Sequence, residues 1–377
     1  MSNNEIKVSV IMPIYNAYDY LRPSMDTVLD QTLREIEVIC IDDGSTDHSL
    51  EIIKEYQSRD ERIRIVTENN AGVSVARNKG IVRARGEFVI FLDADDFYEP
   101  CLLERLYERA VADNLDIAFS LFDTYDERKA RFIPGSIGEH ADIFRDGKVT
   151  SKSEHPDCIL ASTTGYVWNK LFRNSFIREK ELLFSPELYI FEDMYYVSIA
   201  LSLAERVGMV NEVLLHHRVH SEQWRSKLLR KYYDQIPLVY VKTKEFLMAH
   251  GMYVPLSRSF ANLSAAECYK TYRILWNDAK ESFWDILHGG YADKLGWYQH
   301  EAADFEDSAV CDFAANVGLY SHDQYVKRIR SGHSLKIEKL TKETLVRKMK
   351  RSLKLEKLRE LFKRKPKKST NGDRPGA

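Results

Sequence analysis

Strand and helix patterns alternate through the first 120 residues of this 377-residue chain, and polar residues follow each apolar strand directly. Short runs rich in Val, Ile and Phe predict strands at 6–14, 36–41, 63–66 and 88–92, and helical spacing predicts helices at 20–33, 49–57 and 73–84. Strands that are apolar on both faces and separated by helices are typical of a parallel sheet covered on both sides. We therefore expect an α/β fold, a Rossmann-like, mostly parallel sheet flanked by helices.

The polar residues that follow the strands mark the expected ligand site, because ligands of such sheets bind beyond the carboxyl ends of the strands. They are Pro13-Ile14-Tyr15-Asn16, Asp42-Asp43-Gly44-Ser45, Asn70-Ala71-Gly72 with Arg77 on the next helix, and Asp93-Ala94-Asp95-Asp96. We expect these four segments to lie in one crevice.

Asp93 and Asp95 are two carboxylates on the same side of an extended segment. Like charges so close together are unfavourable unless a cation lies beside them. A few hard oxygen ligands suit Mg²⁺ or Mn²⁺ held jointly with a substrate phosphate. The alternative is that Asp93 and Asp95 belong to a turn at the surface end of a strand. The position of the pair after a buried strand disfavours this alternative.

The segment Asp42-Asp43-Gly44-Ser45-Thr46-Asp47 fits a turn that leads into the helix at 49–57. A turn does not account for two adjacent carboxylates at the end of a buried strand. Asp43 could accept a hydrogen bond from the N3–H of uracil, and Tyr15 could stack on the base. Both the dinucleotide motif G-x-G-x-x-G after the first strand and the phosphate-binding motif G-x-x-x-x-G-K-[ST] are absent from the sequence.

These motifs together resemble the nucleotide-binding half of the family-2 glycosyltransferases, which have the GT-A fold. The matching segments are Val8–Asn16, Tyr20-Leu21, Gln31-Thr32, Ile41–Asp47, Asn70–Gly80 and Gly86–Asp96. The resemblance implies inverting transfer of a sugar from a nucleotide-sugar, expected to be a UDP-hexose, to an acceptor hydroxyl.

By this resemblance, Pro13, Tyr15 and Asp43 would hold the base, and Arg77 would bind the nucleotide. Asp93 would bind the ribose or the metal. Asp95 would be the main ligand of a Mn²⁺ or Mg²⁺ ion, which offsets the charge of the leaving diphosphate.

Glu192 and Asp193 resemble the family's Glu-Asp pair, in which the Asp is the general base and the Glu supports the acceptor. The alternative is that both acidic residues only favour the start of the helix predicted at 194–204. His220 resembles a family histidine that completes the metal or diphosphate site, although His217 stands where the family often has Tyr. Trp168 either lines the sugar pocket or fills the core.

We predict three regions, namely a catalytic GT-A domain at 1–224, a helical extension at 225–330, and a basic amphipathic helix with a disordered tail at 331–377. Residues 335–368 hold 15 basic and 4 acidic side chains, whereas the whole chain has a net charge of −2. A tail of this kind favours an anionic membrane surface over a helix packed on the body, and we expect no nucleic-acid partner. The acceptor would then be a glycan or a lipid-linked precursor of a polysaccharide or wall polymer.

The sequence also predicts the compartment. It shows no secretory signal, and its five scattered cysteines suit reduced thiols. We expect a cytoplasmic protein, peripheral at the inner face of the cell membrane if the tail binds there.

Two other functions fit parts of the pattern. A nucleotidyltransferase would use similar carboxylates but needs a Gly-rich, basic loop that residues 12–17 lack. A non-catalytic sugar-nucleotide-binding or scaffold protein would not need the intact acidic residues Asp43, Asp93, Asp95 and Asp193.

Overall fold

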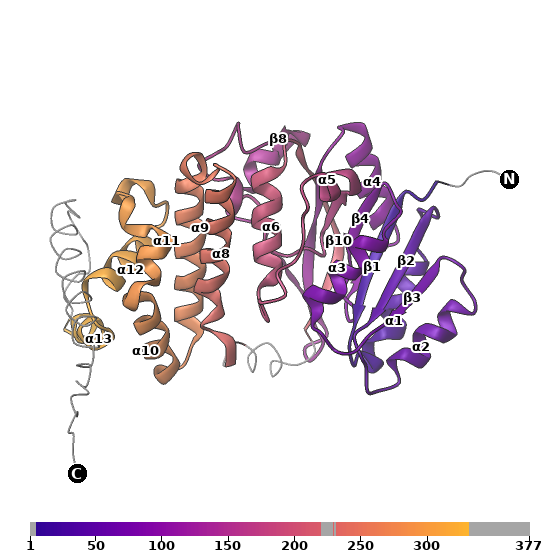
Figure 1. Ribbon diagram of the computed structural model, residues 1–377, viewed down its shortest axis with the longest axis horizontal. Helices are drawn as coiled ribbons and strands as arrows, with labels where there is room; N and C mark the ends of the chain where they lie inside the picture. Colours follow the sequence, from indigo (N-terminus) through magenta and orange to yellow (C-terminus); the bar gives the residue numbers. More distant parts are fainter. Residues whose placement is uncertain (1–4, 220–228, 230, 332–377) are drawn as a thin grey trace, which may run out of the picture.

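The computed structural model of the chain describes residues 5–219, 229 and 231–331 (Figure 1). The strands are β1 (Val8–Ile14), β2 (Ile36–Asp42), β3 (Ile63–Thr67), β4 (Phe88–Phe91), β5 (Phe97–Tyr98), β6 (Ile117–Asp126), β7 (Arg131–Pro134), β8 (Val149–Thr150), β9 (Lys170–Arg173) and β10 (Val207–Val219). The α-helices are α1 (Tyr18–Leu29), α2 (Ser49–Gln57), α3 (Val73–Arg83), α4 (Leu102–Ala112), α5 (Asn174–Glu179), α6 (Glu192–Leu203), α8 (Gln235–Ala249), α9 (Tyr253–Ile274), α10 (Asn277–Ile286), α11 (Ala292–Leu295), α12 (Ser308–Leu319) and α13 (His322–Arg330).

The strands of the described residues form one sheet in the order β3-β2-β1-β4-β9-β6-β10-β5, with β7 paired to β6 and β8 to β10. β1 is parallel to both β2 and β4, so that Val10 pairs with Val38 on one side and with Ile90 on the other. Every residue of β2 is buried, which is the pattern of a strand covered on both faces. The parallel sheet expected from the first 92 residues is confirmed.

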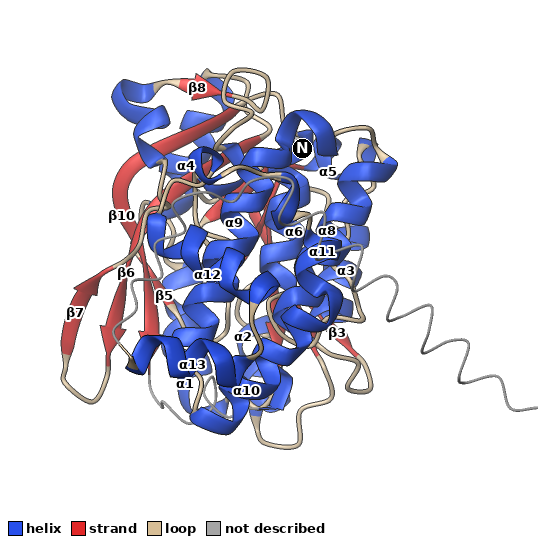
Figure 2. Cartoon of the chain, turned by 90° about the vertical axis from the view of Figure 1, so that its left-hand side faces the viewer, coloured by secondary structure: helices blue, strands red, loops and turns tan. Residues whose placement is uncertain are grey.

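The second half of the sheet is mixed. The short strand β9 lies antiparallel between β4 and β6, and β10 runs parallel to β6. Figure 2 shows β6 and β10 curving side by side, with β7 next to β6. Residues 121–165 contain the end of β6, β7, β8 and two short 3₁₀ segments.

The helix predicted at 49–57 is present with these bounds, and the other helices predicted from the sequence of the catalytic region are present with shifted ends. α1 begins at Tyr18 and ends at Leu29, so Pro23 lies inside the helix rather than in its first turn. α8 begins at Gln235 and ends at Ala249. Pro237 therefore stands in a first turn, where its missing N–H costs no helical hydrogen bond.

The helices α8 to α13 stack beside α6, on the far side of that helix from the sheet (Figure 1). One buried apolar cluster runs from Ile11 of β1 through Tyr196 of α6 to Tyr240, Trp284 and Trp297 in the helical region. This continuous core fixes α6, which begins at the predicted base, between the sheet and the helices. The domain boundaries at 224 and 330 stay a prediction, and the tail at 331–377 lies almost wholly outside the described residues.

Two further findings concern the predicted setting of the chain. No helix among the described residues is long and apolar enough to cross a membrane. The five cysteines are free thiols, three of them buried.

Candidate functional site

The loops after β1 and β2 are joined by side-chain hydrogen bonds at the carboxyl edge of the sheet. The Oδ1 of Asn16 accepts from the backbone N–H of Thr46 at 2.8 Å, and the N–H of Asn16 donates to Ser45 Oγ at 3.2 Å. Asn16 has a φ of 50°, a left-handed conformation that Asn tolerates better than most residues. This junction leaves the side chain of Tyr15 51% exposed, and so available to a ligand.

Asp43 connects the end of β2 to the start of α3. Its two carboxylate oxygens accept from the backbone N–H groups of Ala71 at 2.7 Å and Gly72 at 2.9 Å, and Asp43 is only 4% exposed. Gly72 has a φ of 91°, which explains why glycine precedes α3. Each oxygen of Asp43 keeps a second lone pair, so its contact with a base stays a prediction.

Arg77 of α3 lies at the centre of the site and pairs with three carboxylates. Its Nη1 donates to Glu192 Oε1 at 2.9 Å and to Asp193 Oδ1 at 2.5 Å, and its Nη2 donates to Asp93 Oδ1 at 3.0 Å. Burial alone would lower the pKa of Arg77, but the charges of Asp193, Asp93 and Glu192 outweigh it and raise that pKa. The ring of Phe184 lies 5.2 Å from the guanidinium. One buried cation therefore joins residues predicted for the donor side and for the acceptor side.

The carboxylates after β4 carry unfavourable charge. Burial raises the pKa of Asp93, Arg77 opposes this, and the nearby charge of Asp95 raises it further. Asp96 is fully buried, accepts from the N–H of Arg218 at 2.8 Å and faces Nδ1 of His217 at 3.0 Å. Burial raises the pKa of Asp96 to about 6.

This donor set fits a divalent cation. Two mutually repelling carboxylates, Asp93 and Asp95, lie at the edge where the ligand is expected, and a hard ion would stabilise both in their charged forms. The described residues contain no cluster of three or more ligating side chains, so water and substrate oxygens would supply the remaining positions. His220 lies outside the described residues.

Glu192 and Asp193 form the first turn of α6. The residue before them, Phe191, has a φ of 61°, which turns the chain sharply into the helix, and no side chain caps this helix. Asp193 thus pairs with Arg77 instead of serving as the N-cap. Burial raises the pKa of Asp193 to about 8, and the opposing charge of Arg77 is the largest influence that lowers it.

Trp168 fills the core beside the site. It is 3% exposed and stacks on Tyr166, with ring centres 4.7 Å apart, and on His217, with ring centres 5.7 Å apart. Trp168 was expected either to line the sugar pocket or to fill the core, and the structure shows it in the core. The stack joins the segment 166–168 to the end of β10 next to Asp96.

The structure thus brings Arg77, Asp93, Glu192 and Asp193 into direct contact, with Asp95 close enough to affect the pKa of Asp93. Pro13, Tyr15 and Asp43 lie at the ends of β1 and β2 on the same edge of the sheet.

No functional role was predicted from the sequence for Asp96, His217 or Lys170. The signal for Asp96 was a third carboxylate beside the Asp-x-Asp pair. The signal for His217 was the histidine in place of the family's tyrosine.

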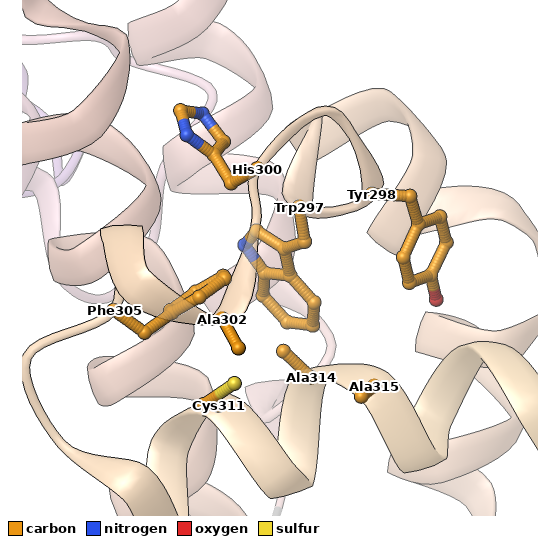
Figure 3. A pocket seen from close by; sticks show the side chains of 8 residues that line it. All are labelled: Trp297, Tyr298, His300, Ala302, Phe305, Cys311, Ala314 and Ala315. Carbon is orange, nitrogen blue, oxygen red and sulfur yellow. The ribbon is translucent and has the colours of Figure 1, made fainter. Parts of the chain in front are cut away.

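A separate small cavity lies in the helical region. Figure 3 shows the indole of Trp297 at its centre, surrounded by Phe305, Cys311 and Ala314. Its volume of about 10 Å³ would hold at most one water molecule. The cavity is therefore no candidate for the substrate site.

Comparison with known proteins shows which family this chain resembles. Residues 9–165 match the sequence model described as Glycosyl transferase family 2. The chain is 34% identical to "Uncharacterized glycosyltransferase EpsJ" of Bacillus subtilis over 56% of this chain and 60% of that protein. It is 31% identical to "Putative glycosyltransferase EpsH" of the same organism over 65% of this chain and 70% of that protein. The match to EpsJ thus spans less than two thirds of that relative's length.

One set of solved structures shares the fold. Residues 1–349 of TarS from S. aureus, solved in complex with UDP, align with a TM-score of 0.64 at 20% identity, over 87% of this chain and 92% of that chain. The same fragment has also been solved in complex with UDP-GlcNAc.

Proposed function

Because this chain belongs to the family-2 glycosyltransferases and has their GT-A fold, we propose that it transfers a hexose from a UDP-sugar to an acceptor hydroxyl with inversion. The observation that carries this proposal is the contact of Arg77 with both Asp93 and Asp193. An inverting displacement needs the leaving group and the base on opposite sides of one sugar carbon. Because Arg77 contacts both Asp93, on the proposed donor side, and Asp193, the proposed base, it keeps these two carboxylates at a fixed separation.

The donor would bind at the ends of β1 and β2. Tyr15 is half exposed there and offers its ring to a base, and Asp43 lies buried behind it. UDP and UDP-GlcNAc bind to the structural neighbour TarS, which favours a uridine nucleotide for this chain as well.

Asp95 and Asp93 would hold a Mn²⁺ or Mg²⁺ ion together with the donor's diphosphate. Such an ion supplies positive charge to the diphosphate as the bond to the sugar breaks. By the family resemblance, His220 would add a ligand. The pairing of Asp93 with Arg77 fixes one carboxylate oxygen and leaves the other for the ion or the ribose.

Asp193 would take the proton of the acceptor hydroxyl on one of its carboxylate oxygens. Since burial raises the pKa of Asp193 to about 8, the group has the basicity that a general base needs near neutral pH. Arg77 favours the carboxylate form and orients it. Glu192, 9% exposed and held by the same guanidinium, would support the acceptor.

The acceptor would be a glycan or a lipid-linked precursor of a polysaccharide or wall polymer. The basic segment 335–368 would bring the enzyme to an anionic membrane surface on the cytoplasmic side. Sedimentation with vesicles of anionic phospholipid should retain the full chain and lose a chain that ends at residue 334. Equal sedimentation of both chains would remove the membrane part of the proposal.

The decisive experiment combines a donor screen with the variant Asp193→Asn. Release of the nucleotide from UDP-, GDP- and TDP-sugars in the presence of Mn²⁺ identifies the donor. In Asp193→Asn this turnover should fall at least about 1,000-fold, while the affinity for UDP, measured by calorimetry, stays within about two-fold. Unchanged turnover would overturn the assignment of the base. Binding of UDP-sugars without turnover of any donor would instead indicate a non-catalytic nucleotide-sugar-binding protein.

A further inference from the structure

Lys170, the first residue of β9, is a buried cation with neutral partners. Its side chain is fully buried, and its Nζ donates to Thr164 O at 2.8 Å, to Tyr166 O at 2.7 Å and to Asn169 Oδ1 at 2.9 Å. All three ammonium protons are thus satisfied, although none of the hydrogen bonds recorded within the described residues joins this ammonium to a carboxylate. Burying a lysine in this way is unfavourable, and an apolar side chain would fill the same space without that cost. A role for the charge would explain why lysine stands here.

Two of the three acceptors belong to the loop at 164–167, which packs on the start of α6. A Cβ added to Gly165 would come within 2.8 Å of Met194 Cγ and 3.3 Å of Met194 Cα, so the loop backbone touches the residue after the predicted base. The backbone N–H of Val167 interacts with the carboxylate of Asp193. The loop therefore forms one wall of the space in which Asp193 lies.

The third acceptor, Asn169, connects the contact between Lys170 and the loop at 164–167, here called the clamp, to the sheet. Asn169 accepts from Lys170, and its Nδ2 donates to Ser120 O of β6 at 2.7 Å. The ammonium thus joins the rigid sheet to the loop, and the loop touches α6.

We propose that Lys170 is a positioning residue for the base, because its ammonium holds the loop at 164–167 against α6 and so keeps Asp193 directed at Arg77. The inference rests on the proposed role of Asp193. The positive charge of Lys170 also favours the carboxylate form of Asp193. The charged groups that influence Asp193 are Arg77 of α3, Glu192 of α6, Asp93 after β4 and Lys170 of β9. Burial lowers the pKa of Lys170 to about 7, and the charge of Asp193 opposes this.

The test compares Lys170→Met with a matched control, Lys244→Met. Lys244 of α8 is also buried, at 8% exposed, and donates to a backbone carbonyl, that of Lys294, at 2.8 Å, but it lies in the helical region. We expect Lys170→Met to lower kcat for release of UDP from the most active of UDP-glucose, UDP-galactose and UDP-GlcNAc by about 10- to 100-fold. Its affinity for UDP should stay within about two-fold, and the acidic limb of its pH–rate profile should move to higher pH. Lys244→Met should leave kcat and the profile unchanged.

Hydrogen exchange gives a readout that needs no turnover. The amide of Val167 should exchange at least about ten-fold faster in Lys170→Met than in the wild type or in Lys244→Met, because the loop has lost its clamp. Exchange at Val167 equal to that of the wild type would overturn the proposal.

A second variant covers the case in which Lys170→Met does not fold. Gly165→Ala keeps the lysine but moves the loop away from Met194, and it should lower kcat by a similar factor at unchanged affinity for UDP. Wild-type kcat in Gly165→Ala would overturn the proposal. Full activity in Asp193→Asn would instead mark the failure of the proposed base. Loss of activity in Asp193→Asn with normal kcat in both loop variants would refute the role of Lys170 alone.

Discussion

Replacing Arg77 by Met should destabilise the fold strongly, and more so at alkaline pH. Arg77 is 3% exposed and lies 2.5 to 3.0 Å from one oxygen each of Asp93, Glu192 and Asp193. Removing one partner of a buried ion pair costs about 3–5 kcal/mol, because the remaining charge is left uncompensated. Three carboxylates share this cation, so we expect a loss in the upper part of that range at pH 8.5.

The dependence on pH has a definite sign. A carboxylate whose pKa is higher in the folded state binds its proton on folding, so its contribution to stability falls as pH rises between the unfolded and folded pKa values. Burial already raises the pKa of Asp193 to about 8, and the loss of Arg77 would raise it further. The loss of stability in Arg77→Met should therefore be smallest near pH 5 and largest above pH 8.

Urea unfolding followed by circular dichroism at pH 5.5, 7 and 8.5 measures this effect. Arg22→Met is the matched control, since Arg22 pairs with Glu55 at the surface and such pairs contribute at most about 1 kcal/mol. Adding Asp193→Asn to Arg77→Met should restore part of the stability at pH 8.5. A loss below about 1 kcal/mol at that pH, or a loss that does not change with pH, would refute the view of Arg77 as the counter-charge of the site.

Three other predictions concern activity and ligand binding. The rate of sugar transfer should rise with pH up to about 8, because the base acts as a carboxylate and burial raises the pKa of Asp193 to about 8; a rate that falls between pH 6 and 8 would contradict this assignment. Asp95→Asn should abolish the gain in UDP affinity that Mn²⁺ produces in calorimetry and leave the midpoint of urea unfolding nearly unchanged, and a retained gain would exclude Asp95 as the main ligand. Tyr15→Ala should weaken UDP binding by about 1–3 kcal/mol through loss of stacking on the base, whereas the control Tyr18→Ala, at a residue equally exposed on the next turn, should not.

The meeting of Tyr15, Asp43 and Asp93 at one edge of the sheet could be predicted from sequence because its signals are local. The strands that carry these residues are short apolar runs, and each places its functional residue within a few positions of its own end. The rule that ligands bind at the carboxyl edge then brings Tyr15, Asp43 and Asp93 together without any knowledge of distant contacts.

The second half of the site could not be predicted in this way. β9 has four residues and gains its strand conformation from β4 and β6, which lie on either side of it. No local period marks a strand so short. The pairing of Arg77 with Asp193 joins residues 116 positions apart, and nothing near either residue in the sequence indicates the other.

Lys170 illustrates the same limit at a single side chain. In the sequence it stands before two apolar residues, Leu171 and Phe172, but a lysine at the start of a short strand is most often a solvated residue. Its three acceptors lie within six residues along the chain, yet it is fully buried, and the ring of the distant Phe119 in β6 lies 5.9 Å from its ammonium.

Charge also links the residues proposed for the donor side to those proposed for the acceptor side. Asp93, Glu192 and Asp193 pair with Arg77, the charge of Asp95 acts on Asp93, and Asp96 pairs with His217. A divalent ion at Asp93 and Asp95 would draw negative charge away from Arg77 and leave the guanidinium to Asp193 and Glu192. Binding of the donor with its ion would then favour the carboxylate form of the proposed base Asp193.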